Sequence, residues 1–273
     1  MKRIVIALLA LVMVFSCVAC TNNQTTDEAE KPSASVEGST EESTAPSTSG
    51  TEEVTVMTYE QFVAAAIDTK VCVETYVQAK QGWWEKEGQG VGTFYTQNEE
   101  GAYFLYEMPC TKAEYDQLTA GTKIRVNGYK AEWSGEVEII DATFEILEGN
   151  FVATAKDVTA LLGTDELIKS QNQFVAFKGL TVAASKNADG EDVAFLYKWD
   201  GSGQEGDDLY FKVTVGENTY SFTVESYLCG ADTDVYKAVK ELKVGDKIDA
   251  EGFLYWYEGV NPHITAVTPV VEG

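Results

Sequence analysis

The stretch "CTKAEYDQLTAGTKIRVNGYKAEWSGEVEI", Cys110–Ile139, decides the fold because the chain contains it twice in related form. The counterpart is "CGADTDVYKAVKELKVGDKIDAEGFLYWYEGVNPHI", Cys229–Ile264. Each copy starts at a Cys, passes through a short helical pattern, and continues into runs in which apolar and polar residues alternate, as they do in strands. The repetition predicts a duplicated domain.

Each copy predicts one short helix. In the first, Thr111 is placed to cap the helix and Glu114 follows three residues later, as in a capping box. We expect Gly121 to end this helix and Gly245 to end its counterpart. Helical segments are also expected ahead of each copy, one from Thr58 and one capped by Thr164.

Five extended runs surround each helix, three before it and two after it. The turn at Ser134-Gly135 separates the last two runs of the first copy. The second copy has an insertion, Lys186–Asp208, between its first two strands. The runs are residues 71–79, 91–97, 102–108, 122–133 and 136–147, and then 174–184, 210–215, 220–226, 246–259 and 263–271.

Five strands with a helix after the third resemble the OB-fold, a small Greek-key barrel. The resemblance covers Val71–Leu147 and Val175–Val267. It implies a mainly β protein with two tandem OB-fold-like five-stranded barrels, each with a short helix between strands three and four, after a disordered tether. We expect the first OB-fold-like domain to occupy residues 55–150 and the second residues 151–273.

The N-terminus predicts export. Lys2 and Arg3 precede the apolar run Ile4–Phe15, which is short for a membrane span and typical of a signal peptide, here residues 1–19. "VMVFSCVAC" resembles the lipobox of bacterial lipoproteins, which implies a lipid anchor on Cys20. Two alternatives are cleavage at Cys17 and an ordinary secretory signal cut after Ala19.

Residues 20–54 are rich in Ser, Thr and Glu and poor in large apolar residues, so we expect a lipidated, disordered tether. The whole chain also resembles lipid-anchored tandem OB-fold proteins of Gram-positive gut-type bacteria, through "QNQFVAFKGLTV", "YKWDGSGQEGDDLYFKV" and "GFLYWYEGVNPH". The resemblance implies a place on the outer face of the bacterial cytoplasmic membrane, extracellular and anchored through the N-terminal lipid. It implies no activity.

The charge balance bears on possible partners. The chain has 20 Lys+Arg against 44 Asp+Glu, a formal net charge of −24, and removal of Lys2 and Arg3 with the signal makes it −26. Nucleic-acid phosphates favour a basic surface. The sequence therefore predicts no nucleic-acid partner and favours a neutral ligand.

Aromatic residues mark the expected binding sites. OB-folds bind across strands two and three, between the loops that join strands one to two and four to five. We expect ligand-binding side chains in these loops, with the alternative that they only close the barrel ends or pack on the neighbouring barrel. The candidates are Trp83, Trp84 and Trp133 in the first barrel and Trp199, Trp256 and Tyr257 in the second.

Catalytic signals are weak, so we expect no enzyme, no catalytic residue and no cofactor. His263 is the single histidine. The sequence contains no recognisable nucleophile triad, zinc cluster or phosphate-binding Gly loop. The acidic insertion does not match the EF-hand spacing, so we expect no metal site, with calcium as the alternative. Cys110 and Cys229 occupy matching places and predict buried thiols, while Cys72 with Cys110 is the one disulfide pair worth testing.

These observations predict a non-catalytic, membrane-anchored extracellular binding module for glycans or another neutral ligand, held by aromatic loop residues. The alternative is a protein-protein interaction or cell-envelope structural module that uses the same aromatics as anchors.

Overall fold

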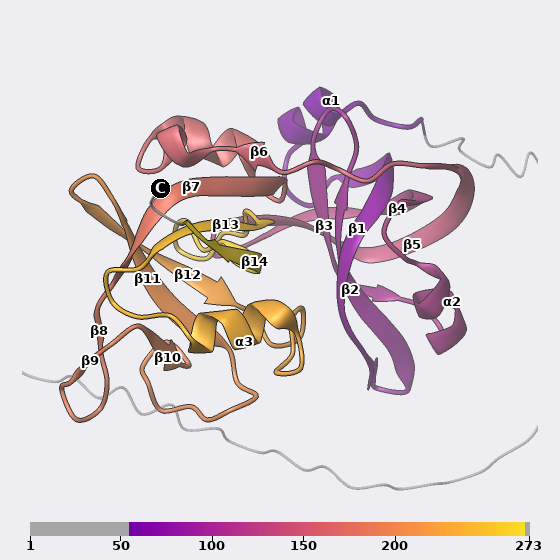
Figure 1. Ribbon diagram of the computed structural model, residues 1–273. Helices are drawn as coiled ribbons and strands as arrows, with labels where there is room; N and C mark the ends of the chain where they lie inside the picture. Colours follow the sequence, from indigo (N-terminus) through magenta and orange to yellow (C-terminus); the bar gives the residue numbers. More distant parts are fainter. Residues whose placement is uncertain (1–54, 271–273) are drawn as a thin grey trace, which may run out of the picture. The chain divides into compact units, whose positions relative to one another are not determined.

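The computed structural model describes residues 55–270 (Figure 1). The expected signal peptide, tether and Cys20 anchor lie outside the described residues. Within residues 55–270, no helix has the length and apolar character needed to cross a membrane. The first barrel and its lead-in comprise α1 (Tyr59–Ala64), β1 (Lys70–Lys86), β2 (Gln89–Gln97), β3 (Ala102–Pro109), α2 (Lys112–Gln117), β4 (Thr122–Trp133) and β5 (Glu136–Asn150).

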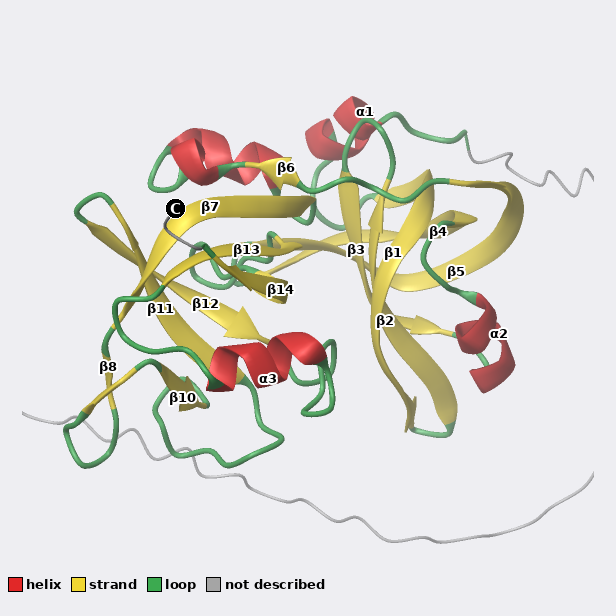
Figure 2. Cartoon of the chain, viewed as in Figure 1, coloured by secondary structure: helices red, strands yellow, loops and turns green. Residues whose placement is uncertain are grey.

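The second barrel follows after the short strand β6 and two 3₁₀ turns. Strand β8 leads into its insertion, which holds β9 and β10, and helix α3 follows β12 and precedes β13 in the sequence. Figure 2 shows β8 and β10 on the same side of this barrel. The elements are β6 (Lys156–Asp157), η1 (Thr159–Leu161), η2 (Asp165–Ser170), β7 (Phe174–Ala183), β8 (Ser185–Lys186), β9 (Asp192–Val193), β10 (Phe195–Tyr197), β11 (Leu209–Val215), β12 (Asn218–Val224), α3 (Asp234–Lys240), β13 (Lys247–Phe253) and β14 (His263–Pro269).

Both barrels close in the same strand order. In the first, the order is β1-β2-β3-β5-β4, and β4 pairs back onto β1. In the second, β7 pairs with both β11 and β13, so that β7-β11-β12-β14-β13 also closes. Strands three and five are parallel in each barrel, and the helix follows strand three. The predicted fold of two OB-fold-like five-stranded barrels is confirmed.

In each barrel, every second residue along the strands points inward and forms the core. In β11, Leu209, Phe211 and Val213 are buried in the core while Tyr210 and Lys212 face outward. The first barrel has an equivalent, separate core around Phe94, Leu105 and Ile139 and other buried apolar residues. A period of two with one buried face is what a sheet closed around its own core requires.

Two local predictions are confirmed, the capping box of α2 and the turn between β4 and β5. Thr111 and Glu114 form the predicted capping box of α2, in which the Thr111 hydroxyl accepts from Glu114 N–H and the Glu114 carboxylate accepts from Thr111 N–H. The turn between β4 and β5 has positive φ at Ser134 (51°) and Gly135 (93°), conformations that Gly adopts without steric cost.

Three local predictions were wrong. The helices end at Gln117 and Lys240, and Gly121 and Gly245 stand just ahead of the next strands instead of at the helix ends. The segment after Thr164 is a 3₁₀ helix, and the Thr164 side chain does not cap it.

The third error concerns Trp83 and Trp84, which lie on β1 and not in a loop. That strand runs on to Lys86 and pairs with β2 through Trp84↔Val91. The pairing contains two register shifts, as β-bulges produce, and continues to Lys86↔Gln89.

The two barrels share an aromatic cluster on the outer face of β2 and β3. Tyr95 and Phe104 of the first barrel pack with Phe253 of the second, and all three are buried. The rings of Tyr95 and Phe253 are stacked at 4.4 Å. The face on which an OB-fold usually binds is therefore covered in the first barrel by the second barrel.

Candidate functional site

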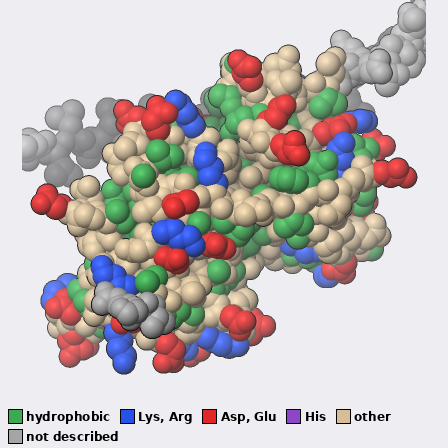
Figure 3. All heavy atoms as spheres, turned by 45° about the horizontal axis from the view of Figure 1, so that its top comes forward, with side chains coloured by type: hydrophobic (Ala, Val, Ile, Leu, Met, Phe, Trp, Pro, Cys, Tyr) green, Lys and Arg blue, Asp and Glu red, His purple; other side chains and the backbone are tan. Residues whose placement is uncertain are grey.

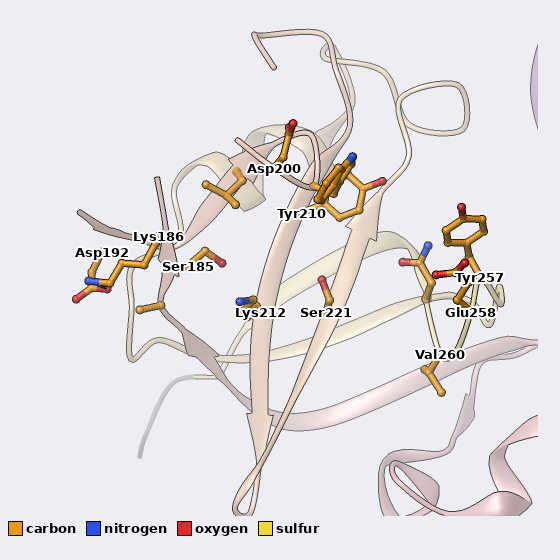
Figure 4. A pocket seen from close by; sticks show the side chains of 14 residues that line it. Ser185, Lys186, Asp192, Asp200, Tyr210, Lys212, Ser221, Tyr257, Glu258 and Val260 are labelled. Carbon is orange, nitrogen blue, oxygen red and sulfur yellow. Dashed lines mark ion pairs between the residues drawn. The ribbon is translucent and has the colours of Figure 1, made fainter. Parts of the chain in front are cut away.

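The equivalent face of the second barrel is open and forms a groove of about 980 Å³. Its floor is the outer face of β11 and β12, which are neighbouring antiparallel strands. In their register, Lys212 lies opposite Ser221, and Tyr210 lies opposite Thr223. Figure 4 shows Tyr210, Lys212 and Ser221 on these strands between two groups of wall residues. The volume is near the upper end of the range of roughly 300–1,000 Å³ for small-molecule sites.

One wall comes from the insertion and the other from the loop between β13 and β14. Ser185, Lys186 and Asp192 lie on the insertion side, and Tyr257 and Glu258 lie on the opposite side (Figure 4). Both walls therefore belong to the loops that border strands two and three of an OB-fold. The remaining lining residues are Ala184, Leu196, Trp199, Asp200, Val260 and Asn261.

Aromatic side chains stand in this groove with large exposed surfaces. Trp199 is 75% exposed and Tyr257 is 48% exposed. Tyr210 is half-buried in the floor, and its pKa is raised because burial disfavours the charged phenolate. Apolar surface left in water is unfavourable unless a ligand covers it.

The groove carries both signs of charge. Lys186 pairs with Asp192 at 2.8 Å on the insertion wall. Lys212 is exposed in the floor and makes no ion pair with any of residues 55–270. Asp200 and Glu258 add acidic groups at the rim. A ligand in this groove thus meets one unpaired cation beneath it and carboxylates beside it.

Asn261 is oriented by a buried neighbour. Its Oδ1 accepts a hydrogen bond from the Thr223 hydroxyl at 2.8 Å, and Thr223 is buried under the groove. Because the amide oxygen is used in this way, the amide NH₂ of Asn261 is the group left for a ligand. With the Ser221 hydroxyl, the site offers polar groups as well as ring faces.

The structure brings together two of the three aromatics predicted for the second barrel. Trp199 and Tyr257 line the same groove. Trp256 does not line it. Its indole instead lies against the first barrel at Gly135, where an added Cβ would be 2.9 Å from Trp256 Cδ1.

In the first barrel, two of the three predicted tryptophans lie at one hollow and the third lies apart. Trp83 packs against the core and its indole N–H donates to Cys110 O at 3.0 Å. Trp83 and Trp84 both border a smaller hollow, together with Tyr106 and Tyr227. Trp133 is 60% exposed at the end of β4. The structure therefore brings Trp83 and Trp84 to one hollow and leaves Trp133 outside it.

Sequence reasoning missed the residues of the groove floor. Tyr210, Lys212 and Ser221 look like ordinary outward-facing strand positions, so only the strand order shows that they lie between the two loops. The available signal was the alternation in "LYFKV", which places Tyr210 and Lys212 on the outer face.

The other candidates have structural surroundings. His263 is buried, shares a 2.8 Å hydrogen bond with the Tyr95 hydroxyl, and has its pKa lowered to about 3 by burial. Cys72, Cys110 and Cys229 are buried free thiols, so the Cys72 to Cys110 disulfide is not formed. Within residues 55–270, no group of three or more His, Cys, Asp or Glu residues is arranged to hold a metal ion.

No protein-family model matches the sequence, and no curated protein matches it. Solved structures do match. A murine DNA binding protein bound with double-stranded DNA is 13% identical, with a TM-score of 0.33, over 74% of this chain and 97% of that one. The HINa domain of Ifi202 in complex with 20 bp double-stranded DNA is 11% identical, with a TM-score of 0.34, over 75% and 97%. A replication protein A heterotrimer bound to single-stranded DNA is 11% identical, with a TM-score of 0.30, over 77% and 52%.

These comparisons contradict two predictions made from the sequence, the preference for a glycan or other neutral ligand and the exclusion of nucleic acid. Nucleic acid was excluded from the net charge of the whole chain, which does not give the charge of an individual surface. On the face drawn in Figure 3, Lys and Arg side chains lie among Asp and Glu side chains. At these identities and TM-scores the likeness concerns the fold, so the ligand must be argued from the groove itself.

Proposed function

We propose that the protein is a non-catalytic binding protein whose second barrel holds a short single-stranded oligonucleotide in its groove. The observation that carries the proposal is the exposed indole of Trp199, which lines the groove together with Tyr210 and Tyr257. Unpaired bases stack on such rings whatever their sequence, and each stacked base contributes roughly 1–3 kcal/mol. Duplex bases are already stacked on one another and do not offer both faces.

The polar groups of the groove complement this stacking. Lys212 in the floor can meet a phosphate, and the Asn261 amide NH₂ can donate to a base oxygen. The carboxylates of Asp192, Asp200 and Glu258 disfavour a long track of phosphates. The groove therefore suits a few nucleotides held mainly by their bases.

The salt dependence follows from this balance. For single strands, log K falls with log salt by about 0.7 for each phosphate neutralised. With Lys212 as the one unpaired cation in the groove, we expect a slope near −0.7, much shallower than that of a basic nucleic-acid-binding surface.

The test is fluorescence anisotropy with the mature chain and a labelled single-stranded ten-mer, titrated at several salt concentrations. A duplex of the same length and a neutral oligosaccharide serve as competitors. We expect saturable binding of the single strand and at least tenfold weaker competition by the other two. The proposal fails if the single strand does not bind, or if the duplex or the oligosaccharide competes better.

We also propose that the protein is a lipoprotein anchored through Cys20 to the outer face of the bacterial cytoplasmic membrane. The support is the apolar run Ile4–Phe15 and the small residues that precede Cys20. Metabolic labelling with a fatty acid should label the wild type and not Cys20→Ala. Continued labelling of the variant would move the anchor to Cys17.

A further inference from the structure

Glu136 of the first barrel is fully buried where the two barrels meet. It is the first residue of β5, directly after the Ser134-Gly135 turn. Its Oε2 accepts a hydrogen bond from Trp256 N–H at 2.9 Å and another from Gln171 Nε2–H at 3.1 Å. Both donors belong to the second half of the chain, so this one carboxyl group joins the two barrels.

The residues next to Glu136 reinforce the same contact. Ser134 O accepts from Glu258 N–H at 2.8 Å, and Gly135 O accepts from Gln171 Nε2–H at 2.9 Å. The Trp256 indole lies against Gly135. Three successive residues of the first barrel thus hold the loop between β13 and β14.

That loop is one wall of the groove. Tyr257 and Glu258 line the groove, and they follow directly on Trp256, whose backbone N–H is bound to Glu136. The first barrel therefore determines where the Tyr257 ring stands relative to the groove floor, although no residue of the first barrel lines the groove.

The carboxyl group of Glu136 has no charge partner. Its Oε1 is buried and accepts no hydrogen bond from the described residues. The titratable groups coupled to it are Tyr59 from α1, Tyr95 from β2 and Tyr255 from the β13–β14 loop, whose pKa values its charge raises, and Glu138 from its own strand. None of them is a cation. Burial, with a smaller contribution from Glu138, raises the pKa of Glu136 to about 8, and it outweighs the hydrogen-bond donors of Asn172, Trp256 and Gln171, which favour the ionised form.

We propose that Glu136 is a positioning residue for the groove: its neutral form, bound to Trp256, holds the Tyr257–Glu258 wall in place, and its ionisation releases that wall. An ionised Glu136 would leave Oε1 charged, buried and unsolvated. Separation of the Ser134–Glu136 turn from the loop would let water solvate that charge. The groove wall is thereby coupled to one proton in the other barrel.

The test is amide hydrogen exchange at Trp256 and Glu258 in the full chain, measured at several pH values between 6 and 9 and corrected for intrinsic exchange rates. Between pH 7 and pH 9, we expect the protection of both amides to fall about tenfold. Glu136→Gln, which keeps a neutral side chain of the same shape, should abolish this pH response. Glu138→Gln is the control on the same strand, because Glu138 is also buried but does not bind the loop. It should keep the fall in protection, shifted to slightly lower pH because Glu138 contributes to the raised pKa of Glu136.

Constant protection of the wild type up to pH 9 would overturn the proposal, and so would an unchanged response in Glu136→Gln. If that variant does not fold, the wild-type response decides alone. A second measurement repeats the oligonucleotide titration at pH 7 and pH 9. This arm rests on the proposed function, whereas the exchange experiment needs no ligand, so failure of one is distinguishable from failure of the other.

Discussion

The Tyr95 hydroxyl and His263 Nδ1 share a hydrogen bond of 2.8 Å in the buried boundary between the barrels. Phe253 stacks on Tyr95 and Tyr255 stacks on His263, each with ring centroids 4.4 Å apart. A polar pair enclosed by aromatic rings is strongly dependent on its geometry, since neither partner can turn to water. We therefore expect the two barrels to unfold together.

Removing the Tyr95 hydroxyl tests this boundary. Tyr95→Phe keeps the ring but leaves His263 Nδ1 buried without its partner, so the free energy of unfolding should fall by about 1–3 kcal/mol. Urea denaturation measures the change. Tyr129→Phe, at a more exposed ring, is the control and should change stability by less than about 0.5 kcal/mol. Two separate transitions in the wild type would contradict the joint unfolding.

His263 predicts a loss of stability in acid. Burial lowers its pKa from 6.5 to about 3, so the folded state stays neutral while the unfolded state takes up a proton below pH 6.5. The stability is fully present above pH 6.5 and declines toward pH 3. By pH 4.5 the expected loss is about 2–3 kcal/mol. His263→Gln should be less stable at pH 7 but should lose less on acidification, and parallel pH profiles for the two proteins would refute this assignment.

Glu136 predicts the opposite trend on the alkaline side. Its pKa is raised from 4.5 to about 8, so the folded state binds a proton that the unfolded state has lost. The contribution of Glu136 to the free energy of unfolding is present in full below pH 4.5. It declines by on the order of 4 kcal/mol as the pH rises to about 8. Glu136→Gln should flatten this part of the profile in urea denaturation. An unchanged slope would mean that the carboxyl group ionises near its ordinary pKa.

Substitution of two exposed tryptophans, one in the groove and one outside it, tests whether the groove binds the oligonucleotide. Trp199→Ala should weaken oligonucleotide binding by roughly 10–100-fold, because one stacking surface is lost, and should leave the melting temperature nearly unchanged. Trp133→Ala removes an indole of similar exposure that does not line the groove, and it should change neither quantity. Equal losses of binding in both variants would argue against the groove.

The adjacent residues Trp83 and Trp84 on β1 should differ in how much each contributes to stability. Trp83 packs on the core and donates to Cys110 O, so Trp83→Ala should cost about 2–4 kcal/mol of stability. Trp84 borders a hollow and belongs to no core cluster, so Trp84→Ala should cost less. Thermal denaturation of both variants makes the comparison, and the reverse order would show that the strand faces are assigned wrongly.

Local chemistry explains what the sequence could predict. Thr111 and Glu114 specify a capping box through contacts three residues apart, and the turn at Ser134-Gly135 has a Gly at one of its two positive-φ positions. The duplicated order of strands and helix then leads to two barrels. The ends of helices and the length of β1 were predicted less well, because strand pairing beyond Lys80 depends on β2 and not on the residues of β1 alone.

The site was less predictable because it depends on what covers each face. Tyr95 and Tyr210 both occupy outward positions on the second strand of their barrels, and alternation treats them alike. Tyr95 is buried by Phe253, whereas Tyr210 lies in an open groove. The difference arises from contacts between residues more than 150 positions apart, which no local pattern encodes.

The covered face of the first barrel also fixes how many ligands one chain can take. A duplicated domain would ordinarily double the number of sites, but here Tyr95 and Phe104 are buried against the second copy. The first barrel has become the support on which the second is built. A saturating titration should therefore end at one ligand per chain, and avidity would have to come from several chains gathered on one surface.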